Sequence, residues 1–410
     1  GLPDTDSLLN VFKRVTSLLR SGKAVTCYTP SIGGIAEAVM KMCFGNLLGF
    51  KYNDNLSVSE IFGYCYGGFL LEVNEDIEDA VQIGEITADG KISYNGEEIK
   101  LDRLLGIYEN KLESVFRCNK QNPETEMQTF SYEAKKRVSP AIKTAKPKVL
   151  IPVFPGTNCE YDSAKAMNDA GAESEIFVIN NLTAENVAKS VEKFANSLKT
   201  AQMVFIPGGF SGGDEPDGSG KFITAFFRNA AVKEQVTELL NNRDGLMCGI
   251  CNGFQALIKL GLVPYGRIID TDEHCPTLTY NIIARHQSKI VRTRIASNKS
   301  PWLSAAEVGD IYSVPISHGE GRFIADDKLI KQLAENGQIA TQYVDENGLA
   351  TNDIRFNPNG SNYAIEGITS PDGRVFGKMG HSERYAHDLY KNVPGNYDIK
   401  MFRSAVNYFK

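Results

Sequence analysis

The alternation of short apolar runs with amphipathic segments after residue 147 constrains the fold of this chain most strongly. The runs KVLIPVF (148–154), QMVFIP (202–207) and GLMCGI (245–250) are rich in β-branched and aromatic residues, as strands are. Longer segments with helical periodicity separate them. Repeated strand–helix units predict an α/β fold with a doubly wound, mostly parallel sheet. In such a sheet the binding site lies beyond the carboxyl ends of the strands.

The part of the chain before this alternation has a mixed pattern. It predicts helices over 7–19 and 31–44, a strand within 67–73 and a hairpin-like stretch over 84–99. We therefore expect a smaller α+β domain over residues 1–120. Residues 121–146 are polar, contain proline and lack apolar periodicity, which is typical of a linker. The α/β domain then spans residues 147–410.

Composition narrows the function classes. The chain has 410 residues with a formal net charge of −6, and it has no basic stripe of the kind that nucleic-acid binding needs. No apolar run approaches the roughly 20 residues of a membrane span, and the start of the chain has no signal-peptide pattern. It also begins without Met, so we expect a processed chain or a piece of a longer one. We predict a cytoplasmic protein that binds neither nucleic acid nor a membrane.

The eight cysteines are scattered along the chain and predict reduced thiols. Cys248 and Cys251 share the spacing of a redox pair, but a redox pair opens a helix, whereas Cys248 falls at the buried end of a predicted strand. The chain has no Cys/His cluster with metal-ligand spacing, so we expect no metal site here.

Cys251 lies at a sharp corner in the sequence GICNGFQ, between Gly249 and Gly253. A Gly-x-Cys-x-Gly segment between a strand and a helix has the layout of a nucleophile elbow. The helix N-terminus and a cationic histidine would favour the thiolate over a free thiol of pKa about 8.5. The alternative is a packed thiol in a turn, which the motif alone leaves open.

A thiolate nucleophile needs a base and a group that orients the base. Of the five histidines, His381 in GKMGHSERY stands out because Glu383 follows two residues later. On an extended segment these two side chains would point the same way, so that Glu383 could orient His381. His318, in SHGEGRF, is the weaker candidate. A surface histidine beside an unrelated glutamate remains the alternative for His381.

The loop PGGFSGGD (207–214) supplies a third piece of chemistry. The backbone N–H groups of Gly208, Gly209 and Phe210, together with that of Asn252, would form an oxyanion hole. A phosphate loop is disfavoured, because DGSGKF lacks the leading glycine and has Phe222 where Ser or Thr is needed. No Gly-x-Gly-x-x-Gly follows a predicted strand either. We therefore expect no cofactor in this part of the enzyme.

Five segments, in order, resemble one family. FPGTNCEYDSAKAMNDAGAE, IPGGFSGGDE, GICNGFQALIKLGLVP, PISHGEGRF and MGHSER look like the flavodoxin-like class I (triad) glutamine amidotransferase domain of large single-chain phosphoribosylformylglycinamidine synthases. Further upstream, TPSIGGIAEAVMKMCFGN and IFGYCYGGFLLEV resemble the C-terminal subdomain of an aminoimidazole-ribonucleotide-synthetase-like half of those enzymes. The chain therefore looks like the last third of such a synthase.

The resemblance implies a site and a reaction. It makes Cys251 the nucleophile, His381 the base and acid, and Glu383 its orienting group, and it implies glutamine hydrolysis that supplies ammonia for ATP-dependent amidine formation in purine biosynthesis. Candidate contacts in the loops are Asn158, Gln255, His318, Glu320 and Arg322.

The same resemblance sets the expected partners and cofactors. They are glutamine and the upstream synthetase domains, with ATP and Mg²⁺ bound by the complete ligase rather than by this part of it. Relatives carry aspartates before their paired glycines, one of which binds magnesium. Here the turn reads Thr29 to Gly34 without a carboxylate, so we expect no metal there. GHSE also replaces the more usual PHPE, with His and Glu at unchanged spacing.

Two other functions fit parts of the pattern. A stand-alone cysteine hydrolase of related α/β fold would share the elbow, but such enzymes bring their histidine after a separate acid or directly after the cysteine. A non-catalytic interaction module would retain the fold without a complete triad. The late His-x-Glu disfavours both alternatives, and an ammonia-release or thiol-labelling assay separates them from a glutaminase.

Overall fold

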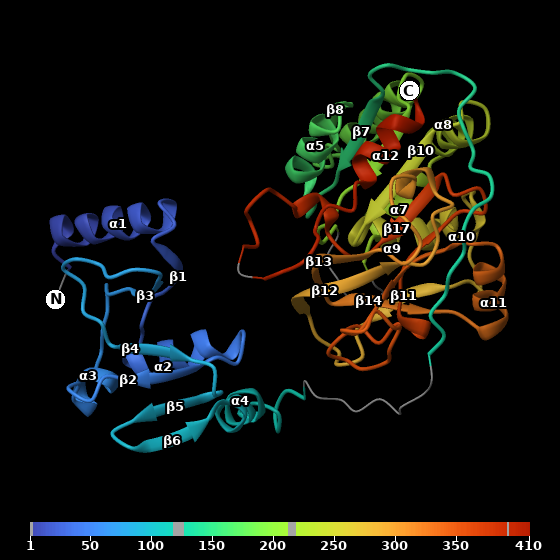
Figure 1. The fold of residues 1–410 in the computed structure, drawn as a ribbon. Helices are drawn as coiled ribbons and strands as arrows, with labels where there is room; N and C mark the ends of the chain where they lie inside the picture. Colours follow the sequence, from blue (N-terminus) through green and yellow to red (C-terminus); the bar gives the residue numbers. More distant parts are fainter. Residues whose placement is uncertain (1–2, 118–126, 212–218, 392) are drawn as a thin grey trace. The chain divides into compact units, whose positions relative to one another are not determined.

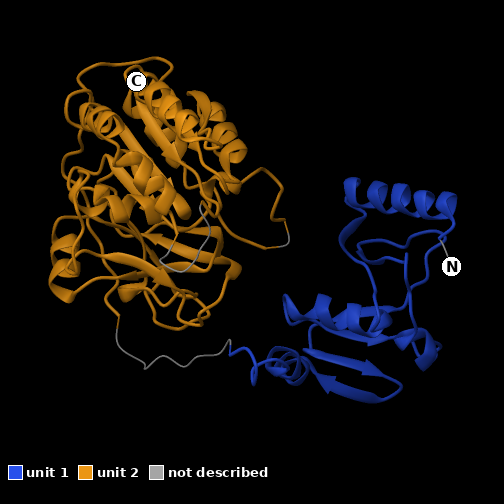
Figure 2. Cartoon of the chain, turned by 180° about the vertical axis from the view of Figure 1, so that it is seen from behind, with its two compact units in different colours: residues 1–118 blue, residues 119–410 orange. Residues whose placement is uncertain are grey.

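The structure is a computed structural model that describes residues 3–117, 127–211, 219–391 and 393–410. The chain divides into two units, residues 1–118 and 119–410, coloured separately in Figure 2. The sequence-based division places the domain border at residue 120 and a linker over 121–146. No helix in the described ranges is both long and apolar enough to cross a bilayer.

The second unit contains a nine-stranded mixed sheet (Figure 1). One half of it is parallel and consists, in spatial order, of β17 (Val375–Lys378), β10 (Leu246–Ile250), β9 (Met203–Ile206), β7 (Lys148–Val153) and β8 (Glu173–Val178). Strands β7, β8, β9 and β10 come from the alternating segments of the sequence, and β17 joins them from near the C-terminus. The α/β fold with a doubly wound parallel arrangement is confirmed.

The other half of the sheet is antiparallel, and sequence analysis did not predict it. It continues from β17 through β16 (Ile365–Thr369), β15 (Ile339–Tyr343) and β12 (Gln287–Ile295) to β13 (Ile311–His318). Two further strands, β11 (Thr277–Tyr280) and β14 (Glu320–Ile324), pair separately. The chain therefore returns toward the parallel strands from the far edge of the sheet.

Helices cover the parallel half in two groups. Helix α9 contacts β9, β10 and β17, and α6, α7 and α8 form a connected layer with it, while α5 and α12 pack together. The elements are α5 (Glu160–Asp169), α6 (Ala184–Leu198), α7 (Lys221–Phe227), α8 (Ala230–Asn241), α9 (Asn252–Leu260), α10 (Leu262–Tyr265), α11 (Asp327–Glu335), α12 (Met401–Tyr408), and the short 3₁₀ helices η1 (Pro301–Leu303), η2 (Asn362–Ala364) and η3 (Ser382–Arg384).

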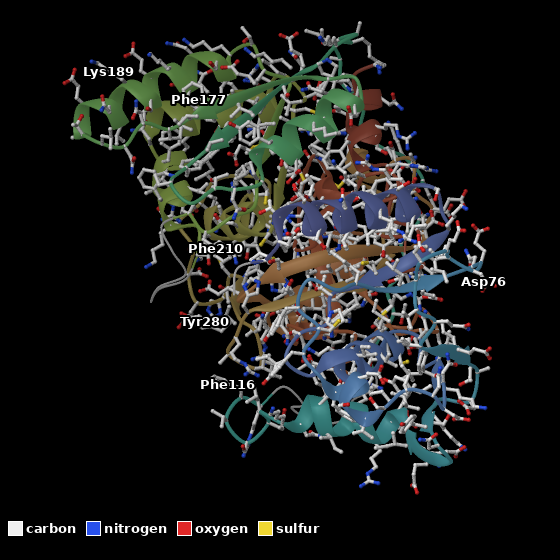
Figure 3. All side chains as sticks on the ribbon, turned by 90° about the vertical axis from the view of Figure 1, so that its left-hand side faces the viewer. Asp76, Phe116, Phe177, Lys189, Phe210 and Tyr280 are labelled. Carbon is white, nitrogen blue, oxygen red and sulfur yellow. The ribbon has the colours of Figure 1, made fainter. Side chains whose placement is uncertain are left out.

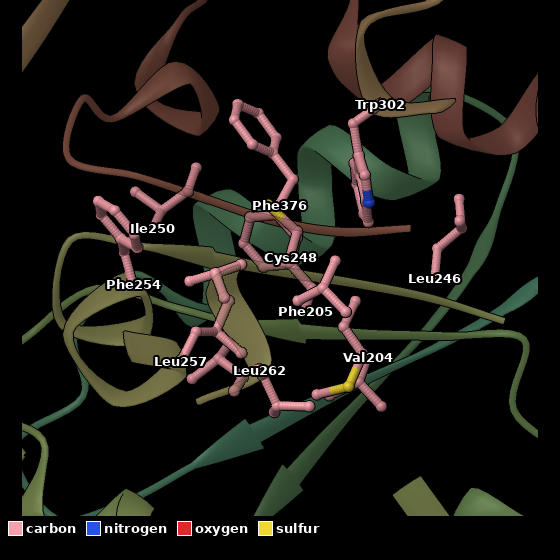
Figure 4. Packing of buried hydrophobic residues seen from close by; sticks show 14 of the residues in the cluster. Val204, Phe205, Leu246, Cys248, Ile250, Phe254, Leu257, Leu262, Trp302 and Phe376 are labelled. Atoms are coloured by element: carbon pink, nitrogen blue, oxygen red, sulfur yellow. The ribbon is translucent and has the colours of Figure 1, made fainter. Parts of the chain in front are cut away.

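The core of the second unit places Cys248 well inside the sheet. Cys248 pairs in register with Phe376 on one side and Phe205 on the other, and Trp302 packs on Phe205 with ring centroids 6.2 Å apart (Figure 4). Its side chain is fully buried. Alternation along a strand sends neighbouring side chains to opposite faces. Cys248 is therefore a packed thiol, as predicted, and all the cysteines that the structure describes are free.

The described part of the predicted linker, residues 127–146, lies along the second unit instead of hanging free (Figure 1). Phe130 is 92% buried, with 8% of its surface exposed, and belongs to the main core. The Tyr132 N–H donates to the Ala296 carbonyl at 2.8 Å. The Thr144 N–H donates to the carbonyl of Phe409, the C-cap of α12, also at 2.8 Å. The polar composition of residues 127–146 does not predict these hydrogen bonds, because they are made by backbone groups, which every residue has.

The first unit is an α+β arrangement with a small core. A four-stranded sheet has the order β4-β2-β5-β6, and β1 pairs with β3. The predicted hairpin over 84–99 is wrong in its first half, because β2 lies between β4 and β5. The elements are α1 (Thr5–Arg20), β1 (Ala24–Tyr28), α2 (Gly34–Phe44), β2 (Gly49–Tyr52), α3 (Val58–Phe62), β3 (Leu70–Val73), β4 (Gly84–Thr87), β5 (Lys91–Tyr94), β6 (Glu97–Lys100) and α4 (Leu101–Asn110).

The inserted strand explains why the local turn signal fails there. Tyr52 on β2 is 4% exposed and packs with Val39, Ile61 and Leu101 in the core of this unit. Burial of an aromatic side chain outweighs the preference of an Asp-Gly turn for a two-stranded hairpin. The β5–β6 hairpin, with Asn95 and Gly96 at its turn, does form.

Candidate active site

Cys251 lies at the corner between β10 and α9 in a strained backbone conformation. Its φ is +53° and its ψ is −105°, which a residue with a Cβ rarely adopts. The Cys251 N–H donates to the Lys378 carbonyl at 2.9 Å, and the Cys251 carbonyl accepts from Gln255 N at 3.0 Å. Strand β17 and helix α9 thus hold the corner. Strain of this kind, maintained by surrounding contacts, is typical of functional sites.

The two flanking glycines let α9 approach the sheet closely. A Cβ at Gly249 would lie 2.5 Å from the Gly253 carbonyl carbon, and a Cβ at Gly253 would lie 2.1 Å from the Ile206 carbonyl oxygen. Gly377 faces the same helix, where a Cβ would lie 2.1 Å from a Phe254 ring atom. Only glycine fits at these positions. The close approach brings the first N–H groups of α9 against Cys251.

We expect Gly253→Ala to displace α9 and to damage both stability and activity. Because the obstructing atom is a backbone oxygen, the helix must move, at a cost of about 3 kcal/mol in the free energy of unfolding. A displacement near 1 Å would slow the chemistry by about 10²-fold. Denaturant unfolding measures the first effect, and the ammonia-release assay measures the second. Gly106→Ala in α4 is the control, since a Cβ there meets nothing within 4 Å. A Gly253→Ala variant with unchanged stability would contradict this account.

His381 and Glu383 form a buried pair. His381 Nδ1 lies 2.6 Å from Glu383 Oε1, and the two residues are 1% and 4% exposed. Burial alone would raise the pKa of Glu383, but the His381 charge and hydrogen bond outweigh it, so its pKa lies below the ordinary value. Glu383 is therefore ionised at neutral pH. Among the described residues, His381 Nε2 has no hydrogen-bond partner.

The pairing arises in a different way from the one predicted. Glu383 lies in η3 (Ser382–Arg384), and His381 is the residue immediately before this 3₁₀ helix. The segment is therefore a tight turn and not extended. The turn curls Glu383 back onto the imidazole. The expectation of an extended segment is wrong, although the two side chains do meet.

The imidazole of His381 lies beside Cys251 across Gly208. A Cβ at Gly208 would lie 2.6 Å from His381 Cε1 and 3.5 Å from Cys251 Cβ. The same position is 3.3 Å from the sulfur of a second cysteine, Cys159, which sequence analysis did not single out. Gly208 therefore leaves the small space around which the predicted base and nucleophile gather.

Cys159 competes with Cys251 for the role of nucleophile, and its surroundings disfavour it. Its sulfur lies 3.9 Å from His381 Nδ1, the nitrogen already bonded to Glu383. The Cys159 thiol donates to Asn158 Oδ1 at 3.1 Å, and Arg384 Nη2 donates to its sulfur at 3.0 Å. Burial raises the pKa of both thiols, so the distinction between them rests on geometry. The Cys159 backbone, with φ −115°, also lacks the strained corner of Cys251.

Cys159, His381 and Glu383 also form a group whose ligand atoms lie within 4.8 Å of one another. Such a donor set can hold a metal ion. Here the short bond between His381 and Glu383 and the Arg384 cation beside Cys159 favour an orienting role for the group over a ligating one.

The surroundings of Cys251 in this state favour the thiol over the predicted thiolate. Burial raises its pKa above the ordinary value and outweighs the lowering by the Asn252 N–H at the start of α9. The Cys251 sulfur lies 3.7 Å from the Ser317 carbonyl oxygen, which accepts from its S–H. The proton must therefore leave during the reaction, which makes a base with a free nitrogen necessary.

The predicted oxyanion loop is described through residue 211, and its residues 212–214 lie outside the described ranges. The Phe210 N–H donates to the Gly156 carbonyl at 2.8 Å, so its predicted place in the oxyanion hole is wrong. The Phe210 side chain is 40% exposed (Figure 3). Asn252, the first residue of α9, keeps a backbone N–H without an intrahelical acceptor. Its side chain accepts from the Ser211 hydroxyl at 2.6 Å.

Three of the candidate loop contacts already make bonds within the protein. Gln255 Nε2 donates to the Glu320 carbonyl at 2.5 Å, which ties α9 to β14. The Arg322 guanidinium donates to the Gly360 carbonyl at 3.1 Å, and Asn158, as noted, accepts from a thiol. These bonds help to fix the walls of the site.

His318 and Glu320 are buried and only partly paired. His318 Nδ1 lies 3.3 Å from Asn281 Oδ1, and Glu320 Oε2 accepts from Ser219 N at 2.8 Å. Within the described part of the chain, His318 Nε2 and Glu320 Oε1 have no partner. Burial lowers the pKa of His318 to about 3, so this imidazole is neutral.

The antiparallel half of the sheet supplies groups that sequence analysis missed. The His381 N–H donates to the Pro315 carbonyl at 2.9 Å, and the Ser317 carbonyl faces Cys251. His286 Nε2 lies 3.0 Å from the Ser317 hydroxyl. No local signal marks these backbone groups, because only strand pairing places them at the site.

Comparisons with known proteins agree with this arrangement. Residues 146–409 match the family described as CobB/CobQ-like glutamine amidotransferase domain. A phosphoribosylformylglycinamidine synthase subunit PurQ of Methanococcus maripaludis is 36% identical over 255 residues, which cover 62% of this chain and 87% of that protein. The PurQ subunit of Salinibacter ruber is 30% identical over 256 residues, covering 62% of this chain and 94% of that protein.

Solved structures show a weaker likeness. A chain of the structure titled "Structure of PurLQS from Thermotoga maritima" is 26% identical, with a TM-score of 0.47, and the match covers 65% of this chain and 100% of that one. The glutaminase domain of CTPS from Trypanosoma brucei is 13% identical with a TM-score of 0.38, over 64% of this chain and 94% of that one.

Proposed function

Because the chain belongs to the CobB/CobQ-like glutamine amidotransferase family, we propose that residues 146–409 hydrolyse glutamine and release ammonia for an amination reaction. The observation that carries the proposal is the strained Cys251 corner beside the buried His381–Glu383 pair. This arrangement combines a nucleophile, a base with a free nitrogen and an ionised orienting group.

The proposed reaction has two steps. As the Cys251 sulfur attacks the side-chain amide carbon of glutamine, His381 Nε2 takes the thiol proton, and the backbone N–H groups of Asn252 and Gly209 stabilise the oxyanion. His381 then gives that proton to the departing nitrogen, which leaves as ammonia. Next, His381 takes a proton from water, whose oxygen attacks the thioester carbon, and returns it to sulfur as glutamate leaves.

We assign recognition of glutamine to the partly paired groups of β13 and β14. Glu320 Oε1 is a buried oxygen without a partner in the described residues, and it suits the ammonium group of an amino acid. Neutral His318, with Nε2 also unpaired there, suits a polar group of the same ligand. A buried polar atom that lacks a partner calls for an explanation, and a bound substrate supplies one.

The wider proposal is that this ammonia aminates formylglycinamide ribonucleotide in purine biosynthesis. Identity of 36% with a PurQ subunit supports it, since that relative is named as part of phosphoribosylformylglycinamidine synthase. We further propose that residues 1–120 are the C-terminal subdomain of a synthetase-like half. In the complete enzyme, synthetase domains would bind ATP and Mg²⁺. A cytoplasmic location stays a prediction of the sequence.

The two alternatives are less well supported. A decayed module kept for its interface would have no reason to keep a strained corner and a buried His381 bonded to an ionised Glu383. A stand-alone cysteine hydrolase would share the chemistry, but the family match covers residues 146–409 and points to glutamine as the substrate.

A glutamine-like electrophile tests the proposal directly. We expect diazo-oxo-norleucine to label Cys251 first among all cysteines, because Cys251 alone among the cysteines of the described ranges combines the corner, the helix N-terminus and the adjacent base. Peptide mapping by mass spectrometry locates the label. Cys159→Ser is the matched control and should still be labelled at Cys251, whereas Cys251→Ser should lose labelling. Label on Cys159 or Cys248 in the wild type would overturn the assignment.

A further inference from the structure

A fully buried ion pair lies behind the proposed catalytic turn. Lys378, the last residue of β17, and Glu366 on β16 are both 0% exposed, with Nζ and Oε1 3.4 Å apart. A buried ion pair loses more hydration free energy on folding than a surface pair does. Apolar residues of similar size often replace such a buried pair without loss of stability. A role beyond general stability therefore has to be sought in what the pair contacts.

The two side chains of the pair make hydrogen bonds to the residues on either side of His381 in the chain. Lys378 Nζ donates to the Gly380 carbonyl and to the Ser382 hydroxyl, each at 3.0 Å. Glu366 Oε1 accepts from the Gly380 N–H at 2.6 Å. The residues immediately before and after His381 are thus bonded to the two charged groups. Charge-assisted bonds of this kind are shorter and stronger than neutral ones.

Lys378 also reaches the nucleophile through its backbone. Its carbonyl accepts the Cys251 N–H at 2.9 Å, at the end of the parallel β10–β17 ladder. One residue therefore holds the nucleophile corner with its main chain and the His381 turn with its side chain. The distance between the two reacting groups depends on this residue.

We propose that Lys378 and Glu366 are positioning residues that hold the His381 imidazole in register with Cys251. The inference rests on the proposed glutaminase function and deepens it, since neither side chain takes part in the reaction described above. The backbone N–H of His381 donates to the Pro315 carbonyl at 2.9 Å. The buried pair fixes the remaining freedom of the turn at Gly380 and Ser382.

Thr341 provides a matched control within the same cluster. Its hydroxyl donates to Glu366 Oε2 at 2.5 Å, on the side of the carboxylate away from Gly380. Thr341→Val thus removes a buried hydrogen bond to the same carboxylate and leaves the bonds to residues 380–382 in place. This variant therefore separates the effect of destabilising the cluster from the effect of losing the hydrogen bonds to residues 380–382.

The decisive variant is the double substitution Glu366→Gln with Lys378→Met. Each single change leaves one buried charge without its partner and should lower Tm, so the single variants do not separate lost stability from lost positioning. The double variant carries neither charge of this pair, so no charge is left there without its partner, and it should recover most of the lost Tm. It still lacks the Lys378 bonds to Gly380 and Ser382.

We expect the double variant to hydrolyse glutamine with kcat about 10²-fold below wild type and with KM little changed, because misplacement of a base by about 1 Å costs that much. Its rate of Cys251 labelling by diazo-oxo-norleucine should fall in parallel, and Thr341→Val should retain nearly the wild-type values of both. A pair that only fills the core would give a double variant with wild-type kcat once Tm is recovered.

The outcomes distinguish the inference from the function beneath it. Wild-type labelling at Cys251 with an undiminished double variant overturns the positioning role alone. Equal losses in kcat for the double variant and Thr341→Val also overturn it. Failure of the wild type to label at Cys251 overturns the proposed function, and the positioning role with it.

Discussion

Replacing His381 with alanine is expected to lower the rate of glutamine hydrolysis by about 10⁴- to 10⁶-fold, as loss of the base does in other triads. The reason lies in the protonation of Cys251. Burial holds the pKa of this thiol above its ordinary value, so little thiolate exists without a base that accepts the proton during attack. The measurement is ammonia release at neutral pH, together with the second-order rate of labelling by diazo-oxo-norleucine.

The His381→Ala experiment needs a histidine control with no link to the site. His274 is suitable, since its side chain is 80% exposed, and His274→Ala should match wild type in both assays. Labelling matters as much as turnover here, because it does not depend on a synthetase partner. A His381→Ala variant that is labelled at the wild-type rate would show that another group activates Cys251.

Replacing Glu383 with glutamine is expected to lower hydrolysis by about 10²- to 10⁴-fold, less than the loss of His381. The carboxylate is ionised, with a pKa below its ordinary value, and accepts from His381 Nδ1–H across 2.6 Å. In the neutral imidazole that bond selects the tautomer with its proton on Nδ1, so that Nε2 can act as a base. An amide can instead donate to Nδ1 and favour the tautomer with its proton on Nε2, which cannot accept the thiol proton.

The Glu383→Gln variant should keep its fold, since the substitution is nearly isosteric. Far-UV circular dichroism and Tm check this, and Glu335→Gln on the exposed side of α11 is the charge-matched control. We expect labelling of Cys251 to slow in the order wild type, Glu383→Gln, His381→Ala. Wild-type labelling and hydrolysis in Glu383→Gln would remove Glu383 from the triad.

Local patterns in the sequence account for the parallel half of the fold. The strands β7, β9 and β10 appear as short apolar runs, and the corner at Cys251 appears as a cysteine between two glycines. Both signals work because they depend on neighbours in the chain, through side-chain alternation and through the space that a missing Cβ leaves. His381 and Glu383 could be paired from their spacing, although the turn that joins them could not.

The register of distant segments could not be read in the same way. The return of β13 brings the carbonyls of Pro315 and Ser317 to the site, and backbone groups leave no mark on the sequence. The hydrogen bond from the Phe210 N–H to the Gly156 carbonyl joins two loops, and it too uses only backbone groups.

The sequence by itself determined the strand–helix order and the identities of the predicted nucleophile, base and orienting group. Only the tertiary structure decided what surrounds them. Lys378 and Glu366 read as ordinary charged residues, which are exposed in most proteins. Strand pairing across β16 and β17 buries both side chains against the His381 turn. Burial and pairing are properties of contacts between segments far apart in the chain, so no local pattern encodes them.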